Sequence, residues 1–171
     1  PKNGGFTLLE VLAVVVIIGI LAGLAYSSLM DIIFTNRAKE TAQTMRTFVE
    51  KSLAEAKRQS ETANIKLNNN GQIVATIGTA SQSQPLSLGY SINTANPIEE
   101  CLPNENTNNS ADFGTSGVNS AWRPGLSSIS GSGYFTACDA RDYCGAAVKV
   151  ETVNTFIACI KRGRNARWEK L

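Results

Sequence analysis

The sequence contains no histidine, and its charge is nearly balanced. Without histidine there is no Ser-His or Cys-His pair to activate a nucleophile, and any zinc site is left to cysteines and carboxylates. The sequence also has no nucleophile-elbow motif. The formal net charge of +2 gives no bulk electrostatic reason to bind nucleic acid. We therefore do not expect an enzyme, and we expect no cofactor.

Cysteine is absent from the first hundred residues, and all four cysteines lie in the C-terminal half. An even number beyond an apolar segment favours two disulfides in an oxidising compartment. The alternative is a four-cysteine metal site, which the lack of any C-x-x-C pair disfavours. Three connectivities exist. We expect Cys144–Cys159, because the segment between them has the pattern of a hairpin, and this leaves Cys101–Cys138.

Charge and proline are also absent from the apolar run between Val11 and Met30. As a helix this run spans roughly 30 Å, the thickness of the hydrocarbon core of a bilayer. Glu10 is the single charge between residues 6 and 30. A lone carboxylate at the end of a membrane helix is costly without a partner, so Glu10 is a candidate functional residue. The alternative is that it only reaches the lipid headgroups.

The segment from Gly5 to Glu10, GFTLLE, together with the apolar run resembles the N-terminal signature of type IV pilins and type II secretion pseudopilins. The segment is thus similar to a class III prepilin-type N-terminus. The resemblance implies cleavage between Gly5 and Phe6 by a prepilin peptidase, followed by N-methylation of Phe6. Glu10 then matches the signature acid. The resemblance is strong over about the first thirty residues, general over the next thirty, and architectural beyond them.

A filament packs many such helices into a nearly dry core, where a carboxylate needs a cation. The early cation of a processed chain is the amine of Phe6. We therefore expect Glu10 to pair with the Phe6 amine of a staggered neighbour and to fix the axial register during assembly.

The run departs from many members of the resembled family because it has no proline near Ala25. Gly19 and Gly23 can loosen the helix instead, since each costs about 1 kcal/mol relative to alanine. Gly19 falls where the family often has glycine. The spacing of the two glycines is also a close-packing pattern for membrane helices, and we therefore include both among the assembly residues.

The chain is expected to divide into a leader remnant at 1–5, a transmembrane or filament-core helix half at 6–30, and a globular head at 31–171. The head begins with an amphipathic helix half at 31–60. Its expected core face is Phe34, Ala38, Ala42, Met45, Val49, Leu53 and Ala56, at spacings of three and four. One continuous helix from about Phe6 to about Ser60 is the simplest interpretation.

After the helix, turn residues and branched apolar residues predict short strands. The expected fold class is α+β, with the long helix packed against a C-terminal antiparallel sheet, and the resemblance implies a pilin-like arrangement of this kind. Val148, Val150, Phe156 and Ile160 are the expected buried face of the sheet. The expected strands are 72–78, 86–92, 133–138, 146–151 and 154–161, and the expected turns and loops are 68–71, 79–84, 93–122 and 139–143.

The segment from Lys161 to Leu171 is basic. It is expected to contact an acidic patch on a neighbouring subunit, an acidic surface or DNA, or to be a solvated end, with Trp168 anchoring it on the domain. Asp112, Asp139 and Asp142 lack the spacing of a calcium-binding loop, so no metal site is expected.

The leading hypothesis is a structural subunit of a type IV pilus, a homo-oligomeric helical filament that serves adhesion, motility or DNA uptake. The resemblance implies an inner-membrane stage, a prepilin peptidase and an inner-membrane assembly machinery driven by a cytoplasmic ATPase. The alternative is a pseudopilin of a type II secretion system in a periplasmic pseudopilus. A second alternative is an uncleaved, membrane-anchored binding module. Nucleic acid and a host surface remain open as partners.

Overall fold

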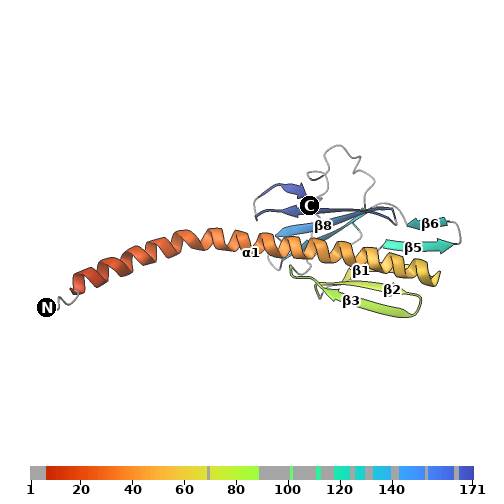
Figure 1. Cartoon of the computed structure of the whole chain (residues 1–171), viewed down its shortest axis with the longest axis horizontal. Helices are drawn as coiled ribbons and strands as arrows, with labels where there is room; N and C mark the ends of the chain where they lie inside the picture. Colours follow the sequence, from red (N-terminus) through yellow and green to blue (C-terminus); the bar gives the residue numbers. More distant parts are fainter. Residues whose placement is uncertain are drawn as a thin grey trace, which may run out of the picture.

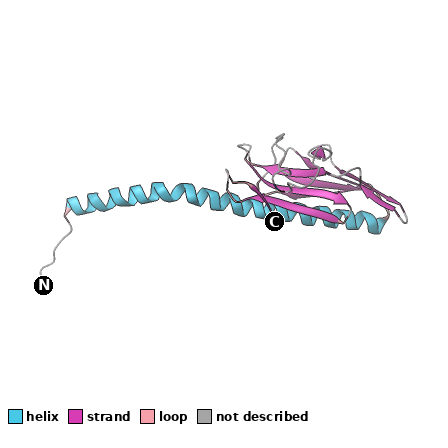
Figure 2. Cartoon of the chain, turned by 90° about the horizontal axis from the view of Figure 1, so that it is seen from above, coloured by secondary structure: helices cyan, strands magenta, loops and turns pink. Residues whose placement is uncertain are grey.

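A computed structural model shows one long helix whose C-terminal half is covered by two sheets, while its N-terminal half extends away from them (Figure 1). The arrangement is α+β, as predicted, with the strands on one side of the helix (Figure 2). The described residues are 7–68, 70–88, 101, 111–112, 118–123, 126–129, 133–139, 143–152, 154–163 and 166–171.

The helix α1 runs without interruption from Leu8 to Gln59. No glycine or proline occurs between residues 24 and 59, so nothing in that part of the sequence breaks the backbone hydrogen bonds. The residue that caps the C-terminus of the helix is Ser60, which takes the left-handed conformation with φ 56°. Lys57 and Arg58 in the last turn complement the helix dipole. The predicted single helix is confirmed over these residues, and its axis curves gently in Figure 1.

The two sheets each contain five strands. The first sheet has the order β3-β2-β1-β5-β6, and the second has the order β10-β9-β8-β7-β4. Neighbouring strands are antiparallel except for β4 and β7, which are parallel. The strands are β1 (Ala63–Asn68), β2 (Gln72–Ile77), β3 (Ala80–Pro85), β4 (Ala111–Asp112), β5 (Val118–Arg123), β6 (Leu126–Ile129), β7 (Gly133–Cys138), β8 (Cys144–Thr152), β9 (Thr155–Lys161) and β10 (Trp168–Lys170).

One stripe of the helix forms the core together with the inner faces of the sheets. All seven helix positions predicted for the core are buried, and Val148, Val150 and Ile160 are buried opposite them, with Phe156 packed against the cluster. The helix contacts both β8 and β9 of the second sheet and β1 and β2 of the first. The predicted amphipathic half is therefore confirmed as the element around which the head folds.

The helix lies close to the second sheet at Gly145. A Cβ atom at this position would lie 2.6 Å from Cζ of Phe34 and 3.2 Å from Cβ of Ala38. Real Cβ atoms essentially never show the first distance, so only glycine fits without a shift of the Phe34 ring, of the helix or of β8.

Three predictions about the strands are wrong. The segment expected as a loop over 79–84 forms β3, because its backbone pairs along its whole length with β2. The long loop expected over 93–122 contains β5, which pairs with β1. The strand expected from Leu86 does not begin there, since residues 86–88 form no strand; Leu86 and Leu88 are instead buried in the core, and the amide of Leu88 donates to Oγ1 of Thr41 at 3.0 Å. Residues 89–92 lie outside the described residues.

The turns predicted at 68–71 and 139–143 are confirmed at their described residues. The amide of Gly71 donates to the carbonyl of Asn68 at 3.2 Å, and Gly71 has φ 71°. The amide of Asp139 donates to the carbonyl of Tyr143 at 3.1 Å, and Oδ1 of Asp139 accepts from the amide of Tyr143 at 3.0 Å. Each turn thus has a hydrogen bond that joins its two ends.

Candidate functional site

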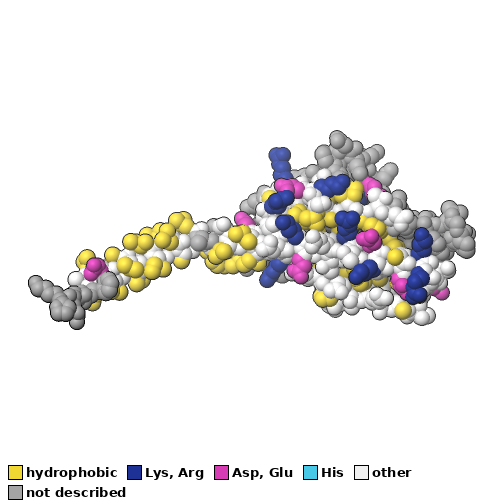
Figure 3. Space-filling model, in the orientation of Figure 1, with side chains coloured by type: hydrophobic (Ala, Val, Ile, Leu, Met, Phe, Trp, Pro, Cys, Tyr) yellow, Lys and Arg dark blue, Asp and Glu magenta, His cyan; other side chains and the backbone are white. Residues whose placement is uncertain are grey.

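The N-terminal half of α1 carries large apolar side chains that are exposed at consecutive positions and therefore on every side of the helix, and Figure 3 shows them in yellow on one face of it. Their exposed fractions lie between 52% and 84%. A helix that is apolar all round is stable only where lipid or other helices surround it. The exposed set is Leu8, Leu9, Val11, Leu12, Val14, Val15, Val16, Ile17, Ile18, Ile20, Leu21, Leu24, Tyr26 and Leu29.

The same segment satisfies the requirements of a membrane span. Among the described residues one helix, Leu8–Gln59, is long and apolar enough to cross a bilayer, and none of its most apolar window is buried within the chain. Its backbone groups are satisfied internally, as lipid requires.

Glu10 lies in the first turn of this helix and forms a capping box with Thr7. The amide of Glu10 donates to Oγ1 of Thr7 at 3.2 Å, and the amide of Thr7 donates to Oε2 of Glu10 at 3.1 Å. The hydroxyl of Thr7 also lies 3.2 Å from Oε2. A carboxylate in the first turn is further favoured by the helix dipole. The carboxylate thus has partners within its own chain.

Sequence reasoning missed Thr7, although the signal was present. Thr7 and Glu10 stand in the T-x-x-E spacing of a capping box, directly before an apolar run. Gly5 and Phe6, the predicted processing residues, lie outside the described residues. The pairing of Glu10 with the Phe6 amine therefore stays a prediction.

Gly19 and Gly23 face open space. A Cβ atom at either position would meet nothing within 4 Å. The chain itself gives these glycines no close neighbour, so the predicted close-packing role needs a helix from another molecule.

The predicted disulfide pairing is wrong. The structure pairs Cys101 with Cys159 and Cys138 with Cys144. The hairpin of β8 and β9 does form, but its register places Ala147 opposite Cys159, so Cys144 lies three residues away from the position that the prediction needs. Cys144 instead lies opposite Cys138 across β7 and β8. The four cysteines are buried in one cluster with Tyr134, Ala147 and Trp168.

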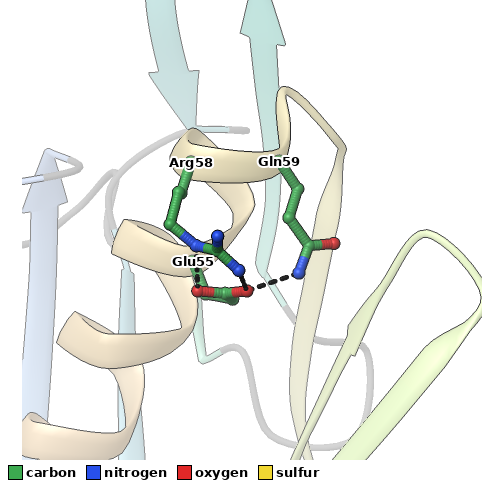
Figure 4. A network of polar contacts seen from close by, with 3 residues as sticks. All are labelled: Glu55, Arg58 and Gln59. Carbon is green, nitrogen blue, oxygen red and sulfur yellow. Dashed lines mark hydrogen bonds and ion pairs between the residues drawn. The ribbon is translucent and has the colours of Figure 1, made fainter.

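A polar network closes the C-terminal end of α1 (Figure 4). Arg58 donates to both carboxylate oxygens of Glu55, from Nε at 2.9 Å and from Nη2 at 2.6 Å. The side-chain amide of Gln59 donates from Nε2 to Oε1 of Glu55. The hydrogen bond from Arg58 is the largest cause that lowers the pKa of Glu55 to about 2, and the bond from Gln59 adds to it. This surface network holds the last helical turn together and lies far along the helix from the apolar half.

Side chains that could share a metal ion are not gathered in the described part of the chain. Among those residues no group of three His, Cys, Asp or Glu side chains is placed to hold a metal ion. Most of the exposed large apolar side chains among the described residues lie on the N-terminal half of α1.

Comparison with known families identifies this N-terminus. Residues 1–26 match the family model of the prokaryotic N-terminal methylation motif, the class III prepilin-type signal of type IV pilins and pseudopilins. Comparisons with curated proteins and with solved structures gave no match. The motif and the exposed apolar helix support a type IV pilin-like or pseudopilin protein and indicate that it is anchored in a membrane before assembly.

Proposed function

We propose that this protein is a structural subunit of a type IV pilus, a homo-oligomeric helical filament on the cell surface. The observation that carries the proposal is the apolar helix half, which is exposed on all sides beside a head with a complete core of its own. Such a segment passes from lipid into a bundle of identical segments without ever meeting water.

The transfer between these two surroundings gains little hydrophobic energy, since lipid tails are as apolar as the neighbouring helices. The fourteen exposed large apolar side chains would each release about 1.5–3 kcal/mol on leaving water, but that gain is already made in the membrane. Extraction therefore needs driven work from the inner-membrane assembly machinery, and packing must hold the filament. Gly19 and Gly23 serve close approach between neighbouring helices in this proposal.

In this proposal, cleavage of the leader creates the N-terminal amine that pairs with Glu10 of another subunit. The prepilin peptidase cuts between Gly5 and Phe6, and the amine of Phe6 is methylated. The carboxylate of Glu10 in one subunit then accepts a hydrogen bond from the Phe6 amine of a neighbouring subunit that is staggered along the filament axis. The capping box uses Oε2 of Glu10, and a carboxylate offers about four lone-pair sites on its two oxygens. The box and the intermolecular pair are therefore compatible on one side chain.

The alternative is a pseudopilin of a type II secretion system. Shearing separates the two functions, because a surface pilus is released from cells by shear and a periplasmic pseudopilus is not. We expect this chain to dominate the sheared fraction. Its restriction to the envelope fraction, with the sheared filaments built from another chain, would favour the pseudopilin.

A further inference from the structure

The basic C-terminal segment folds back onto the head at the end from which the bare helix emerges. Strand β10 pairs with β9, with Trp168 opposite Lys161, and the described residues of the turn between them are 162–163 and 166–167. A Cβ atom on Gly163 would lie 3.8 Å from Cγ of Asp31. The turn therefore packs beside α1 directly after Met30, where the apolar run ends.

This position sets the height of the turn above a membrane. If the run from Val11 to Met30 fills the hydrocarbon core, then Asp31 and the turn beside it lie in the headgroup layer, which is about 5–8 Å thick. A hollow of about 430 Å³ opens at the same level. Its lining is Ser28, Asp31, Ile32, Thr35, Asn36 and Arg162.

The segment from Lys161 to Lys170 contains five basic residues and one acidic residue. Arg162, Arg167 and Lys170 are exposed, and Figure 3 shows dark blue side chains spread over the head, including this end of it. Two carboxylates oppose them. Glu169 accepts from Nε of Arg162 at 2.7 Å, and Asp31 borders the hollow. The basic residues remain in excess.

We propose that the described residues of this connection, 162–163 and 166–167, with Arg162 and Arg167 as the cations, are a docking site for the anionic headgroups of the membrane that holds the helix. The inference rests on the membrane-anchored stage of the proposed function. Each Lys or Arg close to an anionic leaflet strengthens contact about five-fold. Docking would hold the head against the bilayer in a fixed orientation until the subunit is extracted, and extraction would break the contact.

The test uses the full chain in nanodiscs made of phosphatidylcholine alone or mixed with phosphatidylglycerol. The chain has two tryptophans, so Trp122→Phe leaves Trp168 in β10 as the single reporter. A small fraction of lipid carries a nitroxide on its headgroup, which quenches indole fluorescence only at short range. We expect quenching to be about two-fold deeper with phosphatidylglycerol and to lose this difference in about 1 M salt, where charges are screened beyond about 3 Å.

In the same background, Arg162→Gln with Arg167→Gln removes two charges from the turn and is expected to abolish the difference between the lipids. The matched control is Lys51→Gln with Lys66→Gln, which removes two exposed charges elsewhere on the head and is expected to keep it. Equal quenching in both lipids, or equal loss in the control, would overturn the docking site. The comparison at low and high salt uses no Arg variant. It therefore tests the docking site even if the Arg variant misfolds.

Insertion is scored separately, by recovery of the chain in purified nanodiscs. A chain that inserts in neither lipid overturns the membrane stage and the docking site together. A chain that inserts in both with equal quenching overturns only the docking site. Equal quenching combined with retention of duplex DNA, lost in the Arg variant, would assign the turn to nucleic acid instead.

Discussion

Glu10 has hydrogen-bond partners on its own chain before any neighbour is considered. The box with Thr7 caps the helix, and the proposed pair with a Phe6 amine would act between chains. These two roles differ in cost. Loss of a cap costs about 1 kcal/mol, whereas removal of one partner of a buried ion pair costs about 3–5 kcal/mol.

Substitution separates the two roles of Glu10. Glu10→Ala is expected to fold and insert in the membrane but to lower the yield of sheared filaments more than about ten-fold, because it leaves a buried amine unpaired. Thr7→Ala removes the hydroxyl of the cap and is expected to lower the yield much less. Normal filament yield from Glu10→Ala, or equal loss from both variants, would contradict the role in register.

Gly145 gives a test of the packing between helix and sheet. Gly145→Ala is expected to destabilise the head by about 1–3 kcal/mol, because the new methyl group overlaps the ring of Phe34. Urea unfolding of the full chain in detergent measures this change. Gly19→Ala is the matched control, since its methyl group meets open space, and both variants unfolding at the same urea concentration would contradict the close approach.

The surface pair of Glu55 and Arg58 gives a prediction in pH. The pKa of Glu55 is lowered from 4.5 to about 2, so its contribution to the helix end is complete above pH 4.5 and is lost as the pH falls through about 2. An NMR titration of the Glu55 carboxyl carbon should show the low midpoint. Arg58→Gln should move the midpoint up towards 4.5, and an unchanged midpoint would show that this hydrogen bond is not the cause.

At the scale of elements, the sequence predicted the helix better than the strands. The buried stripe from Phe34 to Ala56 follows from a period that α1 repeats many times, and every predicted position is buried. Strand β3 could not be predicted in this way. Its side chains are all exposed, so no alternation of apolar and polar residues marks it, and its pairing with β2 is decided by the neighbouring strand.

The predicted pairing of the cysteines is wrong for a related reason. The sequence predicted the hairpin of β8 and β9 but not its register. In the structure, Cys144 lies three residues from the position opposite Cys159 on β9, and it lies opposite Cys138 on β7. Cysteine spacing alone leaves the connectivity open. The capping box, by contrast, could have been predicted, because its spacing is local.

The two disulfides are expected to differ in their effect on stability. The pair Cys101–Cys159 has a sequence separation of 58 and Cys138–Cys144 a separation of 6. On the chain-entropy account, removal by paired Cys→Ser substitution should cost about 4 kcal/mol for the first and about 2 kcal/mol for the second. Urea unfolding of the two double variants measures both, with each serving as control for the other. A larger loss from the pair Cys138–Cys144 would contradict the assignment.

The molecule as a whole consists of two parts that differ in burial. Among the described residues, the head buries a hydrophobic core between the helix and the two sheets, whereas the large apolar side chains of the N-terminal helix half are exposed. The family match covers residues 1–26, which contain the proposed cleavage site between Gly5 and Phe6. Beyond them, the head folds around the same helix that continues out of it, so a force on the apolar half is transmitted to the head through one unbroken element.

The N-terminal residue of the chain recovered from filaments tests the central claim most directly. Edman sequencing and intact mass of the sheared fraction should give a chain that begins at Phe6 and carries one methyl group on its amine. A chain that still contains Gly4 and Gly5, in cells whose prepilin peptidase is active on another substrate, would contradict processing and with it the passage of the apolar helix from membrane to filament core.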